Sequence, residues 1–253
     1  MTNMSTKPYL LLDAGGTFLF VDQDYLAEVA DAHGLQVEAK RFYEEHFRLV
    51  HWFDTYVSTQ RRFLSRLSEP YSQILLRLTG LPEESAEQAA QVAEARHEQR
   101  HLWEFTFPWI VETLDQLKEE GYRMSIVSNA DGRVEEELRN LEMRGYFERV
   151  YDSEVVGVEK PEPGIYELAL NDLDLQPEEA LFVGDMFYID IWGANRLGIP
   201  GLHLDPLGLY EGWPGEHIRD LRQLPGWLRE YAEAPERFEM LPLRDFALLP
   251  EDE

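Results

Sequence analysis

The chain contains no cysteine, and positively charged residues are scarce in it. The absence of cysteine excludes disulfides, thiolate zinc sites and a cysteine nucleophile. The 23 lysines and arginines stand against 49 aspartates and glutamates, which gives a net charge of −26. Because nucleic acids and anionic membranes attract basic surfaces, we expect this chain to bind no nucleic acid and no membrane. No apolar run reaches the length of a membrane span or a signal-peptide core, so we expect a cytoplasmic protein.

The residues that are present suffice for a large folded domain. Of the 253 residues, 44% are hydrophobic and 12% are aromatic, which supplies material for a sizeable core. This length predicts either one large domain or one domain that carries an insertion.

Short, continuously apolar runs alternate with helix-like segments along much of the chain. Apolar runs of this length are typical of strands that are buried on both faces of a parallel sheet. Their alternation with helices predicts an α/β fold with a doubly wound parallel sheet. The expected strands are 9–12, 124–127, 150–151, 181–183 and 201–204, and the expected helices between the later strands are 111–120, 133–141, 165–170 and 189–197.

The segment from residue 22 to residue 105 breaks this alternation with a helical pattern throughout. So much helix between two strands exceeds an ordinary crossover connection. We therefore expect residues 22–105 to form an inserted all-helical domain, and residues 1–21 and 106–253 to form the α/β core. The helices expected within the insertion are 25–33, 39–52, 61–78 and 83–103.

Polar residues follow three of the expected strands. Asp13 follows the first strand, Ser128 and Asn129 follow the second, and Asp185 follows the fourth. The carboxyl ends of parallel strands face one crevice, where ligands bind, so these side chains should converge there. Lys160 is one of only four lysines and precedes an expected helix. Its compact ammonium suits a site in which one charge bridges several anionic oxygens.

These residues belong to four short motifs that occur in a fixed order. The motifs are Asp13-Ala14-Gly15-Gly16-Thr17, Ser128-Asn129, Lys160-Pro161, and Gly184-Asp185 with Asp190. In this set and order, residues 9–228 resemble the haloacid dehalogenase-like hydrolase superfamily. The helical insertion directly after the first motif is similar to the C1-type cap of subfamily I. The resemblance implies a Rossmann-like core and a Mg²⁺-dependent phosphatase that acts on a small phosphorylated metabolite.

Asp13, Ser128 and Lys160 are the expected catalytic residues. Asp13 supplies a carboxylate that can form an aspartyl-phosphate, which splits one difficult displacement into two steps. Ser128, Asn129 and Lys160 are expected to bind the substrate. Ser128 would donate a hydrogen bond to the phosphoryl oxygens, and Lys160 would neutralise charge on the nucleophile and on the transferring group. The resemblance implies the same roles.

A carboxylate nucleophile that lies beside other carboxylates and a phosphate requires a hard cation. Asp13, Asp185 and the backbone carbonyl of Gly15 form an oxygen set that suits Mg²⁺. Asp190 is either a further metal ligand or a group that supports the ligands. The expected metal residues are therefore Asp13, Gly15, Asp185 and Asp190.

Position 15 departs from the pattern of the superfamily's phosphatases. These enzymes usually carry a second aspartate two residues after the nucleophile, as a general acid and base, and this chain has Gly15. A positioned acid contributes roughly 10²–10⁴-fold to a rate, so we expect slow hydrolysis, above all of alkyl phosphates. Two alternatives stay open: a metal-free 2-haloacid dehalogenase, and a catalytically impaired binding protein on the same fold.

Three further features have structural interpretations. Residues 97–101 match the H-E-x-x-H pattern of zinc proteases, but the stretch is rich in glutamate, glutamine and arginine, and we interpret it as a solvated helix face. Lys40, the only lysine of the insertion, is interpreted as a surface residue rather than a Schiff-base lysine. An aromatic cluster is interpreted as helical core, with a substrate pocket as the alternative, and the oligomeric state stays open. The cluster consists of His51, Trp52, Phe53 and Tyr56.

Overall fold

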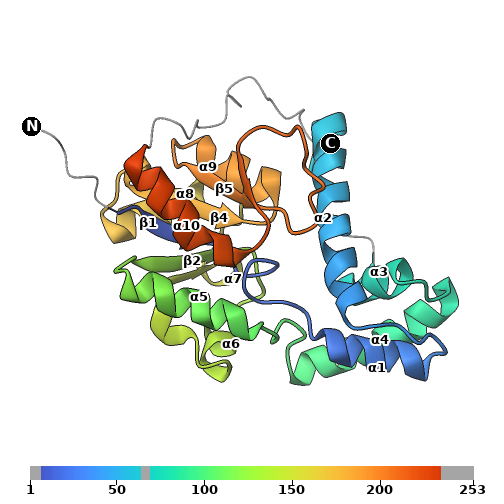
Figure 1. Ribbon diagram of the computed structural model, residues 1–253. Coiled ribbons are helices and arrows are strands. Elements are labelled where there is room, and N and C mark those ends of the chain that lie inside the picture. The colour runs from blue at the N-terminus through green and yellow to red at the C-terminus, as the bar shows by residue number, and fades with distance from the viewer. Residues whose placement is uncertain (1–6, 64–68, 235–253) are drawn as a thin grey trace, which may run out of the picture. The chain divides into compact units, whose positions relative to one another are not determined.

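The computed structural model describes residues 7–63 and 69–234, which divide into two compact units (Figure 1). The first unit joins the start of the chain, as far as Phe18, to the residues from Thr106 onward. The second unit is Leu19–Phe105. The expected outer limits at residues 1 and 253 lie outside the described ranges. None of the helices in those ranges combines the length and apolarity needed to cross a membrane.

A six-stranded parallel sheet forms the centre of the first unit, which confirms the predicted α/β fold class. Its strand order is β3-β2-β1-β4-β5-β6. The five predicted strands are all present, within one residue at each end, and the short β6 was not predicted. The strands are β1 (Tyr9–Leu12), β2 (Met124–Ser128), β3 (Val150–Asp152), β4 (Ala180–Gly184), β5 (Gly201–Leu204) and β6 (Glu216–Ile218).

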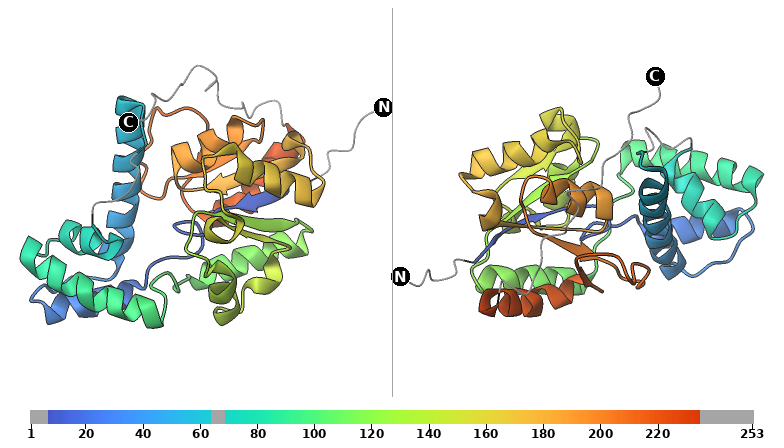
Figure 2. Two further views of the ribbon diagram at one scale, coloured as in Figure 1. Left: turned by 180° about the vertical axis from the view of Figure 1, so that it is seen from behind. Right: turned by 90° about the horizontal axis from the view of Figure 1, so that it is seen from above.

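Helices cover both faces of this sheet. The α-helices are α5 (Pro108–Glu119), α6 (Val134–Asn140), α7 (Ser153–Val156), α8 (Pro163–Leu173), α9 (Gly193–Asn195) and α10 (Leu224–Glu233). In the right-hand view of Figure 2, α5 and α10 lie on one face of the sheet and α8 lies on the other. The three-residue 3-10 turns are η1 (Arg144–Tyr146), η2 (Pro177–Glu179) and η4 (Leu221–Gln223).

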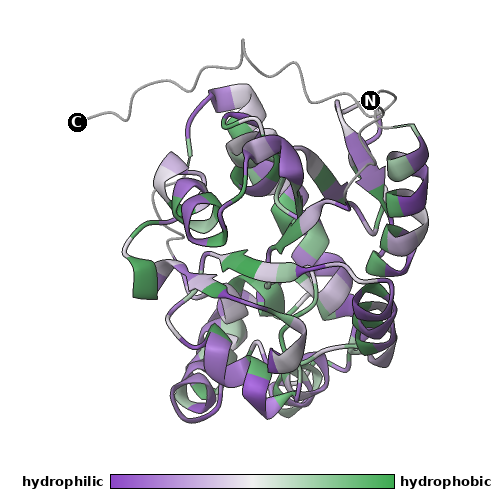
Figure 3. Cartoon of the chain, turned by 90° about the vertical axis from the view of Figure 1, so that its left-hand side faces the viewer, coloured by the Kyte–Doolittle hydropathy of each residue, from purple (hydrophilic) through white to green (hydrophobic). Residues whose placement is uncertain are grey.

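The apolar run of β1 follows from this double cover. All four of its residues are buried. Tyr9 and Leu11 pack in one cluster with Tyr166 of α8. Successive side chains of a strand point to opposite faces, so Leu10 and Leu12 point to the other layer of helices. A strand with helices on both sides must be apolar throughout, and Figure 3 shows hydrophobic colouring along the central strands.

The segment after β4 differs from the prediction. The expected α-helix at 189–197 is instead a π-helix, η3 (Phe187–Trp192), followed by the short α9. Asp190 lies within η3, is only 1% exposed, and donates its backbone N–H to the carbonyl of Met186 at 2.7 Å. Single-turn π-helices are frequent at functional sites.

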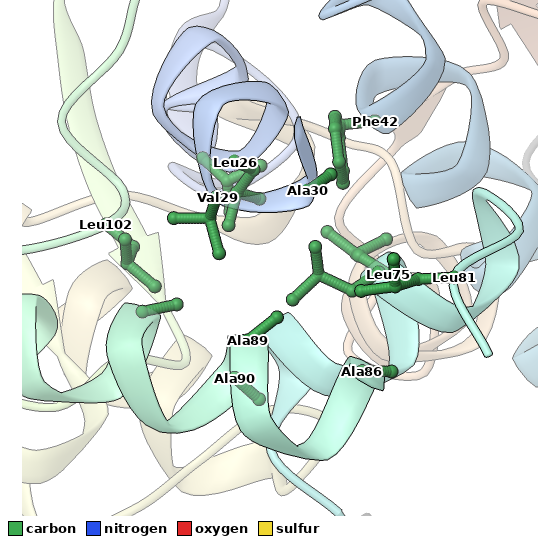
Figure 4. Packing of buried hydrophobic residues seen from close by; sticks show 13 residues of the cluster. Leu26, Val29, Ala30, Phe42, Leu75, Leu81, Ala86, Ala89, Ala90 and Leu102 are labelled. Carbon is green, nitrogen blue, oxygen red and sulfur yellow. The ribbon is translucent and has the colours of Figure 1, made fainter. Parts of the chain in front are cut away.

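Among its described residues, the second unit has four α-helices around a core of its own, part of which Figure 4 shows. Leu26 and Leu75 are fully buried in this core. One helix contributes only alanines to it, and side chains this small let the neighbouring helices approach closely. The helices are α1 (Gln23–Ala32), α2 (Lys40–Gln60), α3 (Tyr71–Leu78) and α4 (Glu83–Gln99), and the alanines of α4 are Ala86, Ala89, Ala90 and Ala93.

Two helices of this unit are shorter than expected. The predicted helix at 61–78 is wrong in its first part, because α3 begins only at Tyr71. Arg61 adopts a left-handed backbone with φ 55°, and this conformation ends α2. Residues 64–68 of this prediction lie outside the described ranges. The predicted helix at 83–103 ends at Gln99, where the backbone becomes extended.

Candidate active site

The strand order brings the first and fourth motifs together. Leu12 of β1 pairs with Val183 of β4, and the backbone N–H of Asp13 donates to the carbonyl of Val183 at 2.9 Å. Asp13 and Asp185 therefore follow adjacent strands at the same edge of the sheet. Ser128 ends β2, which is the other neighbour of β1. The chain changes direction across the sheet at β1, the place where open α/β sheets bind ligands.

The ammonium of Lys160 joins two aspartates of the site, Asp13 and Asp190. Its Nζ lies 2.6 Å from Oδ1 of Asp13 and 2.6 Å from Oδ1 of Asp190. Its side chain is 1% exposed. Burial alone lowers the pKa of Lys160, but the charges of Asp13 and Asp190 outweigh burial and hold that pKa above its ordinary value. Lys160 therefore stays a cation at neutral pH.

The side chain of Asn129 holds the backbone of Lys160. The N–H of Lys160 donates to Oδ1 of Asn129 at 2.7 Å, and Nδ2 of Asn129 donates to the carbonyl of Lys160 at 2.7 Å. Both ends of the amide are thus engaged with one residue. These two bonds indicate that Asn129 positions the backbone of Lys160. The expected contact of Asn129 with the substrate stays a prediction.

Three buried carboxylates form the remainder of the site. Asp13, Asp185 and Asp190 each offer one oxygen, and these three oxygens lie within 4.8 Å of one another. Burial, followed by the charge of Asp13, raises the pKa of Asp185 well above its ordinary value. Burial also raises the pKa of Asp190, to about 7, where the charge of Lys160 opposes the shift and those of Asp13 and Asp185 add to it.

This donor set fits a hard divalent cation. Three carboxylates share a single ammonium in a buried place, where burial first and then the charge of Asp13 raise the pKa values of Asp185 and Asp190. Oxygen ligands of this kind are those that Mg²⁺ prefers. The residues expected at the metal therefore include a compact cluster of carboxylate oxygens.

Asp190 is tied to its surroundings through both oxygens. Oδ1 accepts from Lys160, and Oδ2 accepts from the backbone N–H of Met186 at 2.9 Å. A Cβ atom on Gly184 would lie 2.3 Å from Oδ2, so the glycine of the fourth motif makes room for this carboxylate. These contacts favour a supporting role for Asp190, and direct ligation stays a prediction.

Ser128 and Gly15 are the remaining predicted residues of the site. Ser128 is 3% exposed, and its hydroxyl has no hydrogen-bond partner in the part of the chain that the structure describes, so it is available to a ligand. Gly15 is partly exposed. The neighbouring Gly16 has a left-handed φ of 75°, whereas Gly15 is not among the described glycines with positive φ. An aspartate at position 15 would therefore meet no left-handed backbone there.

Lys40 and the H-E-x-x-H segment belong to the second unit. The interpretation of residues 97–101 as a helix face is wrong at its end, because α4 ends at Gln99, before His101. His97 instead accepts a hydrogen bond at Nδ1 from the backbone of Leu102 at 3.2 Å. Lys40 is a surface residue, as predicted, with a side chain that is 73% exposed beside a glutamate.

The interpretation of the aromatic cluster as core is wrong. None of its four residues is buried, and Trp52 is 52% exposed. The buried stripe of α2 includes Phe47, Val50 and Val57, and the cluster lies off that stripe. The substrate-pocket alternative for the cluster stays a prediction.

Sequence reasoning missed two residues that contact the site. His203 of β5 is fully buried, and its Nε2 lies 2.8 Å from the backbone carbonyl of Asp185. Tyr166 of α8 donates its hydroxyl to the carbonyl of Ile189 in η3. A histidine within the apolar run of β5 was the available signal for the first residue. Tyr166 has the spacing of an ordinary core residue and gave no signal.

Comparison with known proteins points to one family. A model of the haloacid dehalogenase-like hydrolase family matches residues 41–203. This span contains Ser128, Lys160 and Asp185 but begins after Asp13. A glyceraldehyde 3-phosphate phosphatase from Pyrococcus furiosus is 31% identical over 188 residues, which cover 71% of this chain and 73% of that protein. Haloacid dehalogenase-like hydrolase domain-containing protein 3 from Mus musculus is 31% identical over 215 residues, which cover 78% and 82%.

Solved structures share the fold. A HAD phosphatase from Thermococcus onnurineus superposes with a TM-score of 0.55 at 23% identity, covering 87% of this chain and 97% of that one. A 2-haloacid dehalogenase from Pseudomonas syringae superposes with a TM-score of 0.52 at 23% identity, covering 89% and 100%. One fold thus serves both phosphatases and dehalogenases, and the residues of the site must separate them.

The Gly184→Ala variant tests whether the contact between Gly184 and Asp190 maintains the site. The new Cβ must displace Asp190, which in turn bonds to Lys160. A misplacement of about 1 Å can cost roughly 10²-fold in rate, so we expect a loss of that order in hydrolysis of an aryl phosphate. Gly145→Ala is the matched control, because nothing lies within 4 Å of its new Cβ. Equal rates for the two variants would contradict this role.

Proposed function

The chain belongs to the haloacid dehalogenase-like hydrolase family, and from this premise we propose that it is a Mg²⁺-dependent phosphatase with Asp13 as the nucleophile. The observation that carries the proposal is the Lys160 ammonium, which is buried between Asp13 and Asp190 within a cluster of carboxylates. A metal-free reaction leaves the third carboxylate, that of Asp185, without a cation, whereas a bound divalent ion would balance it. A phosphatase needs both the nucleophile and the charge.

In the proposed reaction, a carboxylate oxygen of Asp13 attacks phosphorus, and the bond from phosphorus to the leaving oxygen breaks. The Lys160 ammonium bonds to Asp13 and offsets the charge that gathers as the carboxylate meets the phosphoryl group. The Ser128 hydroxyl donates to a phosphoryl oxygen. Water then attacks phosphorus and releases phosphate, which restores the Asp13 carboxylate.

Asp13, Asp185 and the carbonyl of Gly15 would hold Mg²⁺, with Asp190 as a further ligand or a support. When bound, the ion supplies positive charge to the transferring phosphoryl group. We propose a small phosphorylated metabolite as the substrate class. The names of the relatives support this class. They include a ribulose-1,5-bisphosphate 5-phosphatase from Halopiger xanaduensis, which is 36% identical over 96 residues. The proposal also gives the second unit, Leu19–Phe105, the role of a cap.

The Asp13→Asn variant tests the nucleophile. An amide does not attack phosphorus, so we expect turnover of an aryl phosphate in Mg²⁺ to fall by at least about 10³-fold, the scale of losing a catalytic nucleophile. Asp24→Asn, an exposed aspartate on α1, is the matched control and should keep wild-type turnover. Retained activity in Asp13→Asn would rule out the nucleophile, and wild-type turnover of a haloacid in excess chelator would favour the dehalogenase.

Binding of Mg²⁺ should strengthen as pH rises through neutrality. Asp185 and Asp190 have raised pKa values, that of Asp190 to about 7, so below neutral pH protons compete with the ion for these oxygens. Each displaced proton makes affinity rise by up to about tenfold per pH unit below the pKa. Calorimetric titration of the metal-free protein with MgCl₂ at several pH values measures this slope. A flat profile, or unchanged affinity in Asp185→Asn, would contradict the site.

The Gly15→Asp variant tests whether the missing acid limits the rate. Without it, activated aryl esters should react and alkyl esters should resist, because an alkoxide leaves poorly without a proton. Loss of the aspartyl-phosphate should also be slow, which gives an initial burst of leaving group. We expect Gly15→Asp to gain roughly tenfold or more on alkyl phosphates and little on aryl phosphates. Fast alkyl hydrolysis by wild type would show that another residue supplies the proton, with His51 as the first to test.

A further inference from the structure

One peptide group of the site is held from both sides. The backbone N–H of Met186 donates to Oδ2 of Asp190 at 2.9 Å. The carbonyl of the same peptide, which belongs to Asp185, lies 2.8 Å from Nε2 of His203. His203 is 0% exposed and pairs with Gly184 in the register of β4 and β5. The orientation of Asp185 thus depends on a histidine from the adjacent strand.

The chemistry of the acceptors decides which nitrogen of His203 carries the proton. A carbonyl oxygen only accepts, so Nε2 of His203 must be the donor to Asp185. In a neutral ring, Nδ1 then has a lone pair and accepts. Nδ1 of His203 lies 2.9 Å from Nδ1 of His217, and Nε2 of His217 lies 3.4 Å from the carbonyl of Trp213. The Asp185 carbonyl therefore places the donor of His203 at Nε2, and His217 lies beside the other ring nitrogen.

The surroundings keep the His203 ring in this orientation. Its ring centroid lies 5.7 Å from that of Phe187 and 4.3 Å from that of Tyr210. His203 and His217 are direct partners in the register of β5 and β6. The loop between these strands is anchored by Asp205, which accepts from the backbone N–H groups of Leu209 and Tyr210. The two rings are thus built into adjacent strands.

These bonds form one continuous series from β6 to the nucleophile. Nδ1 of His217 lies within hydrogen-bond distance of Nδ1 of His203, and Nε2 of His203 donates to the Asp185 carbonyl. The N–H of that peptide donates to Asp190, which shares the ammonium of Lys160 with Asp13. A hydrogen bond at the carbonyl of a peptide polarises its N–H, so neighbouring bonds in such a series strengthen each other.

We propose that His203 is a positioning residue for the metal site: its Nε2–H bond to the carbonyl of Asp185 fixes the Asp185–Met186 peptide. The inference rests on the proposed function for the binding of Mg²⁺ by Asp185. Partners behind the ligands of a metal typically change its affinity by about 10–100-fold. The effect is therefore measurable without turnover.

Three variants separate positioning from packing. His203→Phe keeps a ring and removes the donor, whereas His203→Gln keeps an amide donor near the place of Nε2. His46→Phe is the matched control, because His46 is also buried among aromatic rings but lies in the second unit. We expect dissociation constants for Mg²⁺ to rise about tenfold or more in His203→Phe and to stay near wild type in the other two variants.

Nuclear magnetic resonance of the metal-free wild type gives the second readout. Nitrogen shifts should show Nε2–H on His203, and the carbonyl shift of Asp185 should change in His203→Phe but not in His46→Phe. An Nδ1–H tautomer on His203, or an unchanged Asp185 shift and Mg²⁺ affinity in His203→Phe, would overturn the inference. If His203→Phe does not fold, the wild-type tautomers and His203→Gln decide it. If wild type binds no Mg²⁺, the proposed function fails, while the Asp185 shift still decides the role of His203.

Discussion

The ammonium of Lys160, held between Asp13 and Asp190, is the interaction on which the rest of the site depends. A buried charge without a partner costs several kcal/mol, whereas this one has two partners at 2.6 Å. Both ion pairs join segments that are distant in the chain. The two contacts with Lys160 span 147 and 30 residues. The fold and the proposed chemistry thus depend on the same three side chains.

The excess of negative charge around this ammonium connects the fold to the proposed cofactor. Asp185 adds a third carboxylate, and the sheet places it beside Asp13 because β1 and β4 are neighbours. The apolar strands exclude water from beneath the site, which raises the electrostatic cost of this excess. A divalent cation relieves that cost. The same excess discourages a second anion, so substrate and cation are expected to bind together.

Much of this arrangement could be predicted from the sequence, because the physical signals are local. Strands covered on both faces must be apolar, and residues at their carboxyl ends must converge. The short β6 has no such apolar run and was missed. Three features depend on partners that are distant in the chain and were not predicted. They are the bonds of Asn129 to the backbone of Lys160, the π-helix around Asp190 and the contact of His203 with Asp185. Residue types and spacing do not encode such partners.

The most direct test of the central claim is to find where phosphorus is bound during turnover. Enzyme in Mg²⁺ is mixed with excess aryl phosphate, quenched in acid within the first turnover, and reduced with borohydride, which converts an acyl phosphate to an alcohol. Peptide mass spectrometry then locates the changed residue. The account predicts that Asp13 is converted in wild type and that no residue is converted in Asp13→Asn. Conversion at another carboxylate, or hydrolysis at full rate with none converted, would contradict it.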